Sequence, residues 1–175
     1  MRKFSSWLLC KMMVRSCTLR LSTSAAGFSS NSALYHKLVI QEQKVDAMDA
    51  RNPHQVDPFL FDITARVKKD ADLQYVEAEI LATVRKFADE LVPRDRLKAV
   101  KSHLRYSFSL GMDNSEAIAQ VVGRAVALRR SADTIDKLYA LYAQLTPRDI
   151  QDVARKYLVA NGRTTVTLTS KSGAR

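Results

Sequence analysis

Histidine is scarce in this chain of 175 residues, and its scarcity limits the metal chemistry that the sequence can support. The three histidines are His36, His54 and His103. Two imidazoles on one helix bind the same ion only when they lie about one turn apart, and none of the three has another histidine at that spacing. We therefore assign no catalytic, cofactor-binding or metal-binding residue from the sequence.

Cysteine is also scarce, and long apolar runs are absent. The two cysteines are Cys10 and Cys17, and their spacing is not the two-residue gap of a zinc knuckle or a redox pair. We interpret them as incidental thiols that form no disulfide framework. No run approaches the ~20 apolar residues of a membrane-spanning helix, so the sequence predicts no transmembrane segment.

Acidic side chains are absent from residues 1–41, which carry six basic side chains. The rest of the chain carries 22 basic and 18 acidic side chains, so more than half of the net charge of +10 comes from the N-terminal segment. The remaining surface has an ordinary mixture of charges, and its charge does not predict a nucleic-acid partner.

The chain is predicted to form one α+β domain, because it is long enough for a single core and too short for two. Helices are expected where apolar residues recur every three or four positions, and strands where they alternate or are β-branched. This predicts helices over residues 30–43, 73–91, 97–108, 118–128, 135–145 and 147–158, and strands over residues 45–51, 60–68 and 163–168.

Two of these segments carry further detail. In the strand over residues 60–68, every second residue is apolar, and this side is predicted to face the core. Asp72 is a plausible cap for the helix that follows it, and residues 113–116 offer a capping box for a later helix. The apolar side of the strand consists of Phe61, Ile63, Ala65 and Val67.

The last thirty residues contain the clearest local pattern. Thr146 can accept hydrogen bonds from the first amides of a helix, Pro147 suits the first helical position, and Asp149 completes a capping box. After this helix, the pair Asn161 and Gly162 predicts a turn with positive φ, and a β-branched strand follows. The segment therefore predicts a capped helix that packs against a sheet.

The residue pattern of this segment resembles the closing part of the pitrilysin/insulinase (M16) family of zinc metallopeptidases. Earlier segments are similar to that family in the same order, and the resemblance covers roughly residues 24–170. They are the helix of residues 34–43, the strand of residues 57–65, and the helices of residues 73–91 and 96–105.

The resemblance implies a particular place within the family. Its active members hold zinc with an inverted motif, His-x-x-Glu-His, in an upstream domain, and this motif is absent here. The chain is thus expected to be a non-catalytic C-terminal domain, inactive alone, that lines the peptide-holding chamber of a zinc metalloendopeptidase. Its partners would be a metal-bearing M16 domain or subunit and, through the assembled peptidase, a peptide substrate. The alternative is a catalytically silent M16-like scaffold or binding subunit.

The resemblance also implies that one substrate-binding feature is missing. In some family members an arginine and a tyrosine flank the Glu-Gln of the helix that corresponds to residues 34–43, and they hold the substrate backbone. The matching positions here are Val39 and Asp46, so this chain is not expected to clamp a substrate. The glutamates that could be mistaken for the missing zinc ligand, Glu77, Glu79 and Glu90, are interpreted as the polar side of a helix.

Residues 1–23 lie outside the resemblance and are interpreted as a basic, disordered leader that precedes a domain of residues 24–175. Their composition is typical of a mitochondrial presequence, but we favour an arbitrary leader, because the domain that follows resembles only part of a peptidase. The resemblance implies a larger sheet whose first strands would precede residue 24, so part of the sheet is expected to be missing. An incomplete sheet has an unpaired edge, and self-association is therefore predicted.

Overall fold

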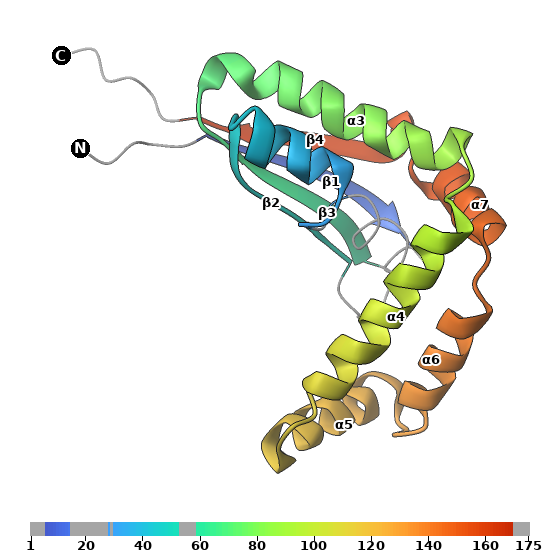
Figure 1. Ribbon diagram of the computed structural model, residues 1–175. Coiled ribbons are helices and arrows are strands. Elements are labelled where there is room, and N and C mark those ends of the chain that lie inside the picture. Colours follow the sequence, from blue (N-terminus) through green and yellow to red (C-terminus); the bar gives the residue numbers. More distant parts are fainter. Residues whose placement is uncertain (1–5, 15–27, 29, 53–58, 170–175) are drawn as a thin grey trace.

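The computed structural model describes residues 6–14, 28, 30–52 and 59–169. Its strands form one antiparallel sheet in the order β2-β3-β1-β4 (Figure 1). Strands β1 and β3 lie inside the sheet, and β2 and β4 lie at its edges. The strands are β1 (Ser6–Val14), β2 (Val45–Arg51), β3 (Phe59–Val67) and β4 (Arg163–Leu168).

Strand β1 corrects the interpretation of residues 1–23 as a leader outside the domain. Leu8 lies opposite Ala65 of β3 on one side and Thr167 of β4 on the other, and its side chain is buried. The sequence signal is the nearly unbroken apolar run of residues 7–14, which is typical of an interior strand but shows no periodicity. One of the strands expected to be missing is therefore present in the N-terminal segment.

The helices occupy the rest of the described chain, and each long one coincides with a segment that was predicted to be helical. This confirms the predicted α+β class, with an antiparallel sheet packed against several helices. The elements are α2 (Ala33–Tyr35), the π-helix η2 (His36–Gln41), the short 3-10 turns η3 (Asp70–Asp72) and η4 (Ala160–Gly162), α3 (Leu73–Asp89), α4 (Arg94–Leu110), α5 (Ser115–Arg129), α6 (Thr134–Gln144) and α7 (Pro147–Tyr157).

The predicted α-helix over residues 30–43 is instead a short α-helical turn followed by the π-helix η2. Ser32 begins this segment, because its buried Oγ accepts a hydrogen bond from the Tyr35 N–H at 3.1 Å. The wider π turn still buries both Leu34 and Leu38. The segment thus departs from the α-helical form that its apolar spacing predicts, and π-helices are rare in proteins.

The prediction of positive φ at Asn161 and Gly162 is wrong. Both lie in the 3-10 turn η4, where the Gly162 N–H donates to the Val159 carbonyl at 3.2 Å, and no glycine in the described residues has a positive φ. A 3-10 turn reverses the chain without a left-handed residue. The left-handed positions are Gln43, after η2, and Arg130, at the C-terminus of α5.

The capping box of α7 is confirmed. The Asp149 N–H donates to Thr146 Oγ1 at 3.3 Å, and the Thr146 N–H donates to Asp149 Oδ2 at 2.8 Å. Hydrogen bonds from the Thr146 hydroxyl and amide hold the pKa of the Asp149 carboxyl below its usual value. The box predicted for α5 is a single cap, in which Asn114 Oδ1 accepts from the Ala117 N–H at 2.8 Å.

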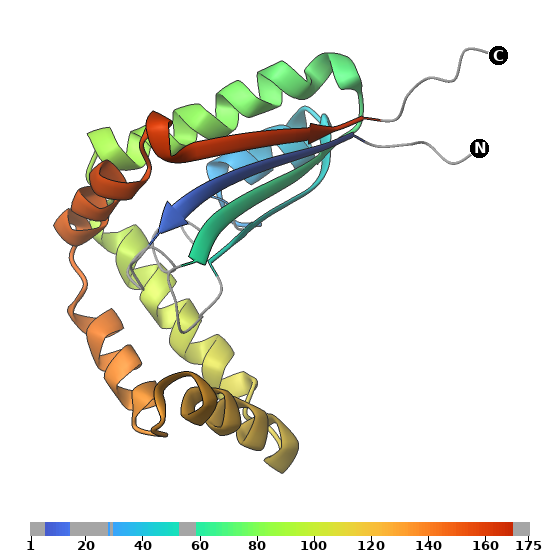
Figure 2. The same cartoon turned by 180° about the vertical axis from the view of Figure 1, so that it is seen from behind.

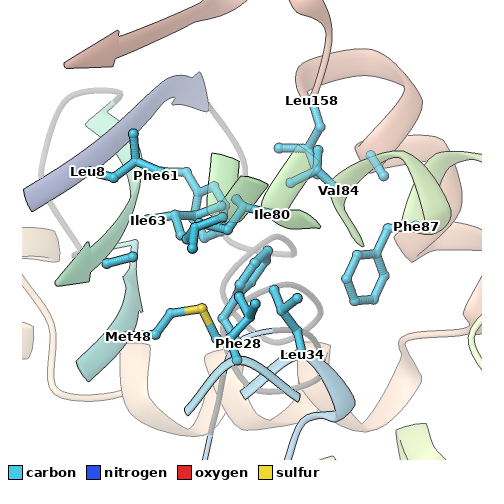
Figure 3. Close-up of a cluster of buried hydrophobic side chains, with 14 of the residues drawn as sticks. Leu8, Phe28, Leu34, Met48, Phe61, Ile63, Ile80, Val84, Phe87 and Leu158 are labelled. Carbon is cyan, nitrogen blue, oxygen red and sulfur yellow. The ribbon is translucent and has the colours of Figure 1, made fainter. Parts of the chain in front are cut away.

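The core lies between one face of the sheet and the helices η2, α3 and α7 (Figure 3). The predicted inward side of β3 is confirmed, because Phe61, Ile63, Ala65 and Val67 are all buried. The ring of Phe28 packs at 6.4 Å from that of Phe61. The helices contribute Leu34, Leu38, Val76, Ile80, Val84, Phe87, Ile150, Ala154 and Leu158 to this core.

Helix α7 is joined to α3 by side chains that satisfy backbone groups. Gln151 is buried, and its Nε2 donates to the Asp89 carbonyl at 3.1 Å. Arg155 Nε donates to the Ala88 carbonyl at 2.8 Å. These carbonyls lie at the C-terminus of α3, where a helix leaves acceptors without intrahelical partners. These hydrogen bonds therefore join two helices that are far apart in the sequence at the edge of the core.

The helices α4, α5 and α6 extend away from the sheet and form what we call the helical arm, residues 94–144 (Figure 1). Most of its apolar residues are only partly buried, in contrast with those of α3. None of the helices in the described part of the chain is long and apolar enough to cross a membrane.

We predict that Leu8→Ala lowers the free energy of unfolding by ~2–5 kcal/mol, the usual cost of truncating a buried leucine. The matched control is Leu9→Ala, because Leu9 lies on the opposite face of the same strand and is only half-buried. Urea unfolding of both variants measures the difference. Deletion of residues 1–23 should also destabilise the domain. Equal, small losses for Leu8→Ala and Leu9→Ala would contradict the placement of β1 in the core.

Candidate functional site

The described histidines do not form a metal site. His36 begins η2 and His103 lies on α4, and both side chains are exposed. His54 and Cys17 lie outside the described residues. Among residues 6–14, 28, 30–52 and 59–169, no group of three or more histidine, cysteine or acidic side chains could hold a metal ion. The residues in the described structure therefore do not fit the zinc site that the family resemblance implies for an active domain.

Two of the three glutamates in and just after α3, Glu79 and Glu90, take part in ion pairs. Glu79 lies 2.8 Å from the Lys37 ammonium of η2, and Glu90 lies 3.8 Å from Lys86, one turn earlier on the same helix. The first pair joins two elements of the core, whereas the second is an exposed pair of small energetic value. Glu79 and Glu90 thus have structural partners.

A cluster of charged side chains surrounds Tyr75 of α3. The Tyr75 hydroxyl donates to Glu42 Oε1 at 2.9 Å. The ammonium groups of Lys44 and Lys37 lie 4.0 and 5.5 Å from the centre of the Tyr75 ring, within the range of cation–π attraction. We call Lys37, Glu42, Lys44, Asp72 and Tyr75 the Tyr75 cluster. It fixes the end of η2 and the start of β2 against the start of α3.

Asp72 takes part in this cluster and does not cap α3 as predicted. Its backbone is already helical, and its side chain accepts no hydrogen bond from the first turn of α3. Its carboxylate lies 3.1 Å from the Lys44 ammonium. The ion pair with a residue distant in sequence therefore replaces the local cap.

The charges of the Tyr75 cluster oppose a catalytic role for its lysines. A hydrogen bond to Glu79 raises the pKa of Lys37, and a hydrogen bond to Asp72 raises the pKa of Lys44. A lysine that acts as a nucleophile or a general base needs a lowered pKa, so that the neutral amine is populated near neutral pH. Both lysines stay protonated, and the cluster is best explained as a structural joint.

Val39 and Asp46, the positions that match the substrate-clamping arginine and tyrosine of some M16 members, lie on η2 and β2, the elements that the Tyr75 cluster joins. Val39 lies on η2, is half-buried and has no polar side-chain atom. Asp46 lies on β2, and its carboxylate is 3.1 Å from Arg66 and 3.6 Å from Lys68. An ionised carboxylate only accepts hydrogen bonds, and this one is held by two cations. Neither side chain therefore supplies the donors that a peptide-backbone clamp of arginine and tyrosine would use.

The other face of the sheet carries exposed aliphatic side chains of β4. In Figure 2 the strands lie in front of η2 and α3, α7 lies to one side of the sheet, and no described helix covers this face. The register places Leu9 between Thr64 of β3 and Val166 of β4 on it. Val166 and Leu168 are 49% and 67% exposed. We call Leu9, Leu60, Thr64, Val166 and Leu168 the open face.

The buried and open faces of the sheet differ in their cover. Val166 and Leu168 of β4 are exposed on the open face. The apolar side of β3 is buried, because η2, α3 and α7 pack on it. The sequence could not distinguish the two faces of β4, since its residues alternate between threonine and aliphatic side chains that both suit a strand.

Comparison with known proteins shows the fold. No family model matches the sequence, and no curated protein matches it. A protease from Helicobacter pylori has a TM-score of 0.84 at 18% identity, and the match covers 95% of this chain and 42% of that one. The inactive peptidase domain of a putative zinc protease from Bordetella parapertussis has a TM-score of 0.80 at 18% identity, covering 96% and 94% of the two chains.

A peptidase M16 inactive domain from Pseudomonas fluorescens has a TM-score of 0.78 at 10% identity, with 95% of this chain and 41% of that chain covered. The chain thus has the fold of inactive M16 peptidase domains, which confirms at the level of the fold the resemblance drawn from its sequence. It spans less than half the length of the Helicobacter pylori and Pseudomonas fluorescens chains.

We predict that the purified chain binds no stoichiometric zinc and cleaves no peptide, because no described residues provide a ligand set with a water-activating glutamate. Metal analysis after dialysis and a fluorogenic peptide assay, with and without chelator, test this. One tightly held zinc per chain, or cleavage that a chelator abolishes, would contradict it.

Proposed function

We propose that the chain is the non-catalytic C-terminal domain of an M16-like zinc metalloendopeptidase, which lines the peptide-holding chamber and supports an active half that carries the zinc motif elsewhere. The likeness to inactive domains of zinc proteases supports this proposal. A peptide substrate would meet this chain only in the assembled peptidase.

The observation that carries the proposal is the uneven covering of the sheet. The helices η2, α3 and α7 bury one face, whereas the open face presents Leu9, Val166 and Leu168 together with the hydroxyl of Thr64. A surface with both apolar and hydroxyl groups suits an extended peptide or a second domain. Its hydroxyls can form hydrogen bonds with the partner, and its apolar side chains can pack against those of the partner. The outer edge of β4 adds backbone groups that no described strand pairs with.

The alternative is a catalytically silent scaffold or binding subunit of a larger complex. The same fold serves both roles, since function resides in sites and not in the fold itself. A scaffold would need a stable partner on the open face but would gain no peptidase activity from a metal-bearing domain. The two roles are therefore distinguished by whether a metal-bearing M16 domain restores cleavage.

We predict that the isolated chain self-associates and binds a hydrophobic dye through the open face. Val166→Thr with Leu168→Thr should reduce both, because threonine suits a strand but removes apolar surface. Sedimentation velocity and dye fluorescence measure the two effects. A metal-bearing M16 domain added in trans should compete for the open face and restore chelator-sensitive cleavage.

The matched control is Val126→Gln with Leu141→Gln, which removes similar apolar residues that are 43% and 58% exposed on the helical arm. This variant should associate as the original chain does. A monomer that binds no dye, or an equal effect of the control, would overturn the role of the open face. Suppressed association without restored cleavage would favour the scaffold.

A further inference from the structure

The helical arm contains a cleft between α4 and α6. The two helices run antiparallel, because Lys101 in the middle of α4 contacts the C-terminal end of α6, whereas Phe108 near the end of α4 stacks on Tyr139, with 4.6 Å between ring centres. The cleft has a volume of about 260 Å³. It is lined by Lys98, Lys101, Ser102, Leu104, Arg105, Tyr139, Tyr142 and Ala143.

The floor of the cleft is largely aromatic and aliphatic. Tyr142 is only 8% exposed, and its ring packs edge-on against that of Tyr139 with 5.8 Å between centres. Leu104 of α4 is half-buried beside them. Buried aromatic side chains with neighbours on both sides offer a preformed surface, which binds a partner at little cost in side-chain entropy.

The rim of the cleft is positively charged. Lys98, Lys101 and Arg105 recur at intervals of three and four residues, so they share one face of α4. The Lys101 ammonium donates to the carbonyls of Ala143 and Leu145 at 2.8 and 2.7 Å, and thereby satisfies the C-terminus of α6.

Lys98 and Arg105 are exposed and form no ion pair with any carboxylate in the described part of the chain. The positive charge of Lys101 acts on the carboxylate of Asp149. This carboxylate already accepts hydrogen bonds from the Thr146 amide and hydroxyl in the capping box of α7. The cleft therefore combines a fixed apolar floor with two cations available to a partner.

We propose that this cleft binds an acidic peptide segment of a partner protein. One apolar side chain of the segment packs against Leu104, Tyr139 and Tyr142, and flanking carboxylates pair with Lys98 and Arg105. The proposal concerns the helical arm and does not depend on the chamber role of the open face. Complementary charge would set the orientation and the rate of association, while the buried floor supplies affinity.

The dimensions of the cleft favour a peptide over other ligands. Its volume lies near the lower end of the ~300–1,000 Å³ typical of clefts that bury a drug-sized molecule, which suits an inserted side chain. Single-stranded nucleic acid requires exposed aromatic faces for base stacking. Tyr142 is buried, and Phe108 covers part of Tyr139, so the cleft offers a poor stacking platform.

The test uses the full chain and a short fluorescein-labelled peptide of glutamates around a central leucine, with fluorescence anisotropy as the readout. Lys98→Glu with Arg105→Glu should weaken binding by about tenfold or more, because two attractive charges become repulsive. Both side chains are exposed, so the variant should keep its thermal midpoint. Lys101 is left unchanged because it satisfies α6.

The matched control is Arg124→Glu with Arg129→Glu on α5, which changes the net charge equally at exposed positions. This control should keep the peptide affinity within about twofold, because neither arginine lines the cleft. A peptide with glycine in place of leucine should bind more weakly to the original chain. Equal losses in the two charge variants, equal binding of the glycine peptide, or no binding at all would each overturn the proposal.

Discussion

The pairing of β1 between β3 and β4 is the constraint on which the sheet depends. It joins the first described residues of the chain to the last strand, because β4 has no other partner among the described strands. The side chain of Leu8 anchors β1 in the core, where it packs near Phe61 and Ile63. The complete four-stranded sheet therefore requires the first described strand to pair with the last. Pairings of such large sequence separation require the closure of a long loop before any contact stabilises it.

The sheet divides the molecule into a buried and an exposed side. On the buried side, Gln151 and Arg155 of α7 donate to backbone carbonyls at the C-terminus of α3, so α7 satisfies acceptors of α3 as well as covering the strands. The open face has no such cover from any described helix. A surface of this kind is the natural place for a second domain or a peptide, because apolar residues such as Val166 gain from burial.

Charged side chains have different tasks in the two parts of the molecule. Around Tyr75 they are paired, and the pairing holds Lys37 and Lys44 in their protonated forms, which suits a joint between η2, β2 and α3. On α4, Lys98 and Arg105 have no such partners in the described chain, and they stand beside an apolar floor. Unpaired cations at the rim of a cleft can attract an acidic partner, and they contribute little to the stability of the fold.

Local patterns in the sequence determined much of this protein. Apolar spacing placed the long helices, alternation identified the buried side of β3 from Phe61 to Val67, and the capping box of Thr146 and Asp149 marked the start of α7. These features depend on residues within a few positions of one another. The number and spacing of the histidines can likewise be read directly from the sequence. That spacing alone excludes a helical zinc motif with two histidines one turn apart.

The tertiary structure decided the features whose partners are distant in the sequence. The apolar run of β1 has no periodicity, so only pairing with β3 and β4 distinguishes it from a leader. The π turn of η2, the ion pair that draws Asp72 to Lys44, and the side of the sheet that remains open all follow from packing against other elements. Backbone propensity acts within one or two turns, whereas the burial of apolar surface and the pairing of charges act between segments that only the folded chain brings together.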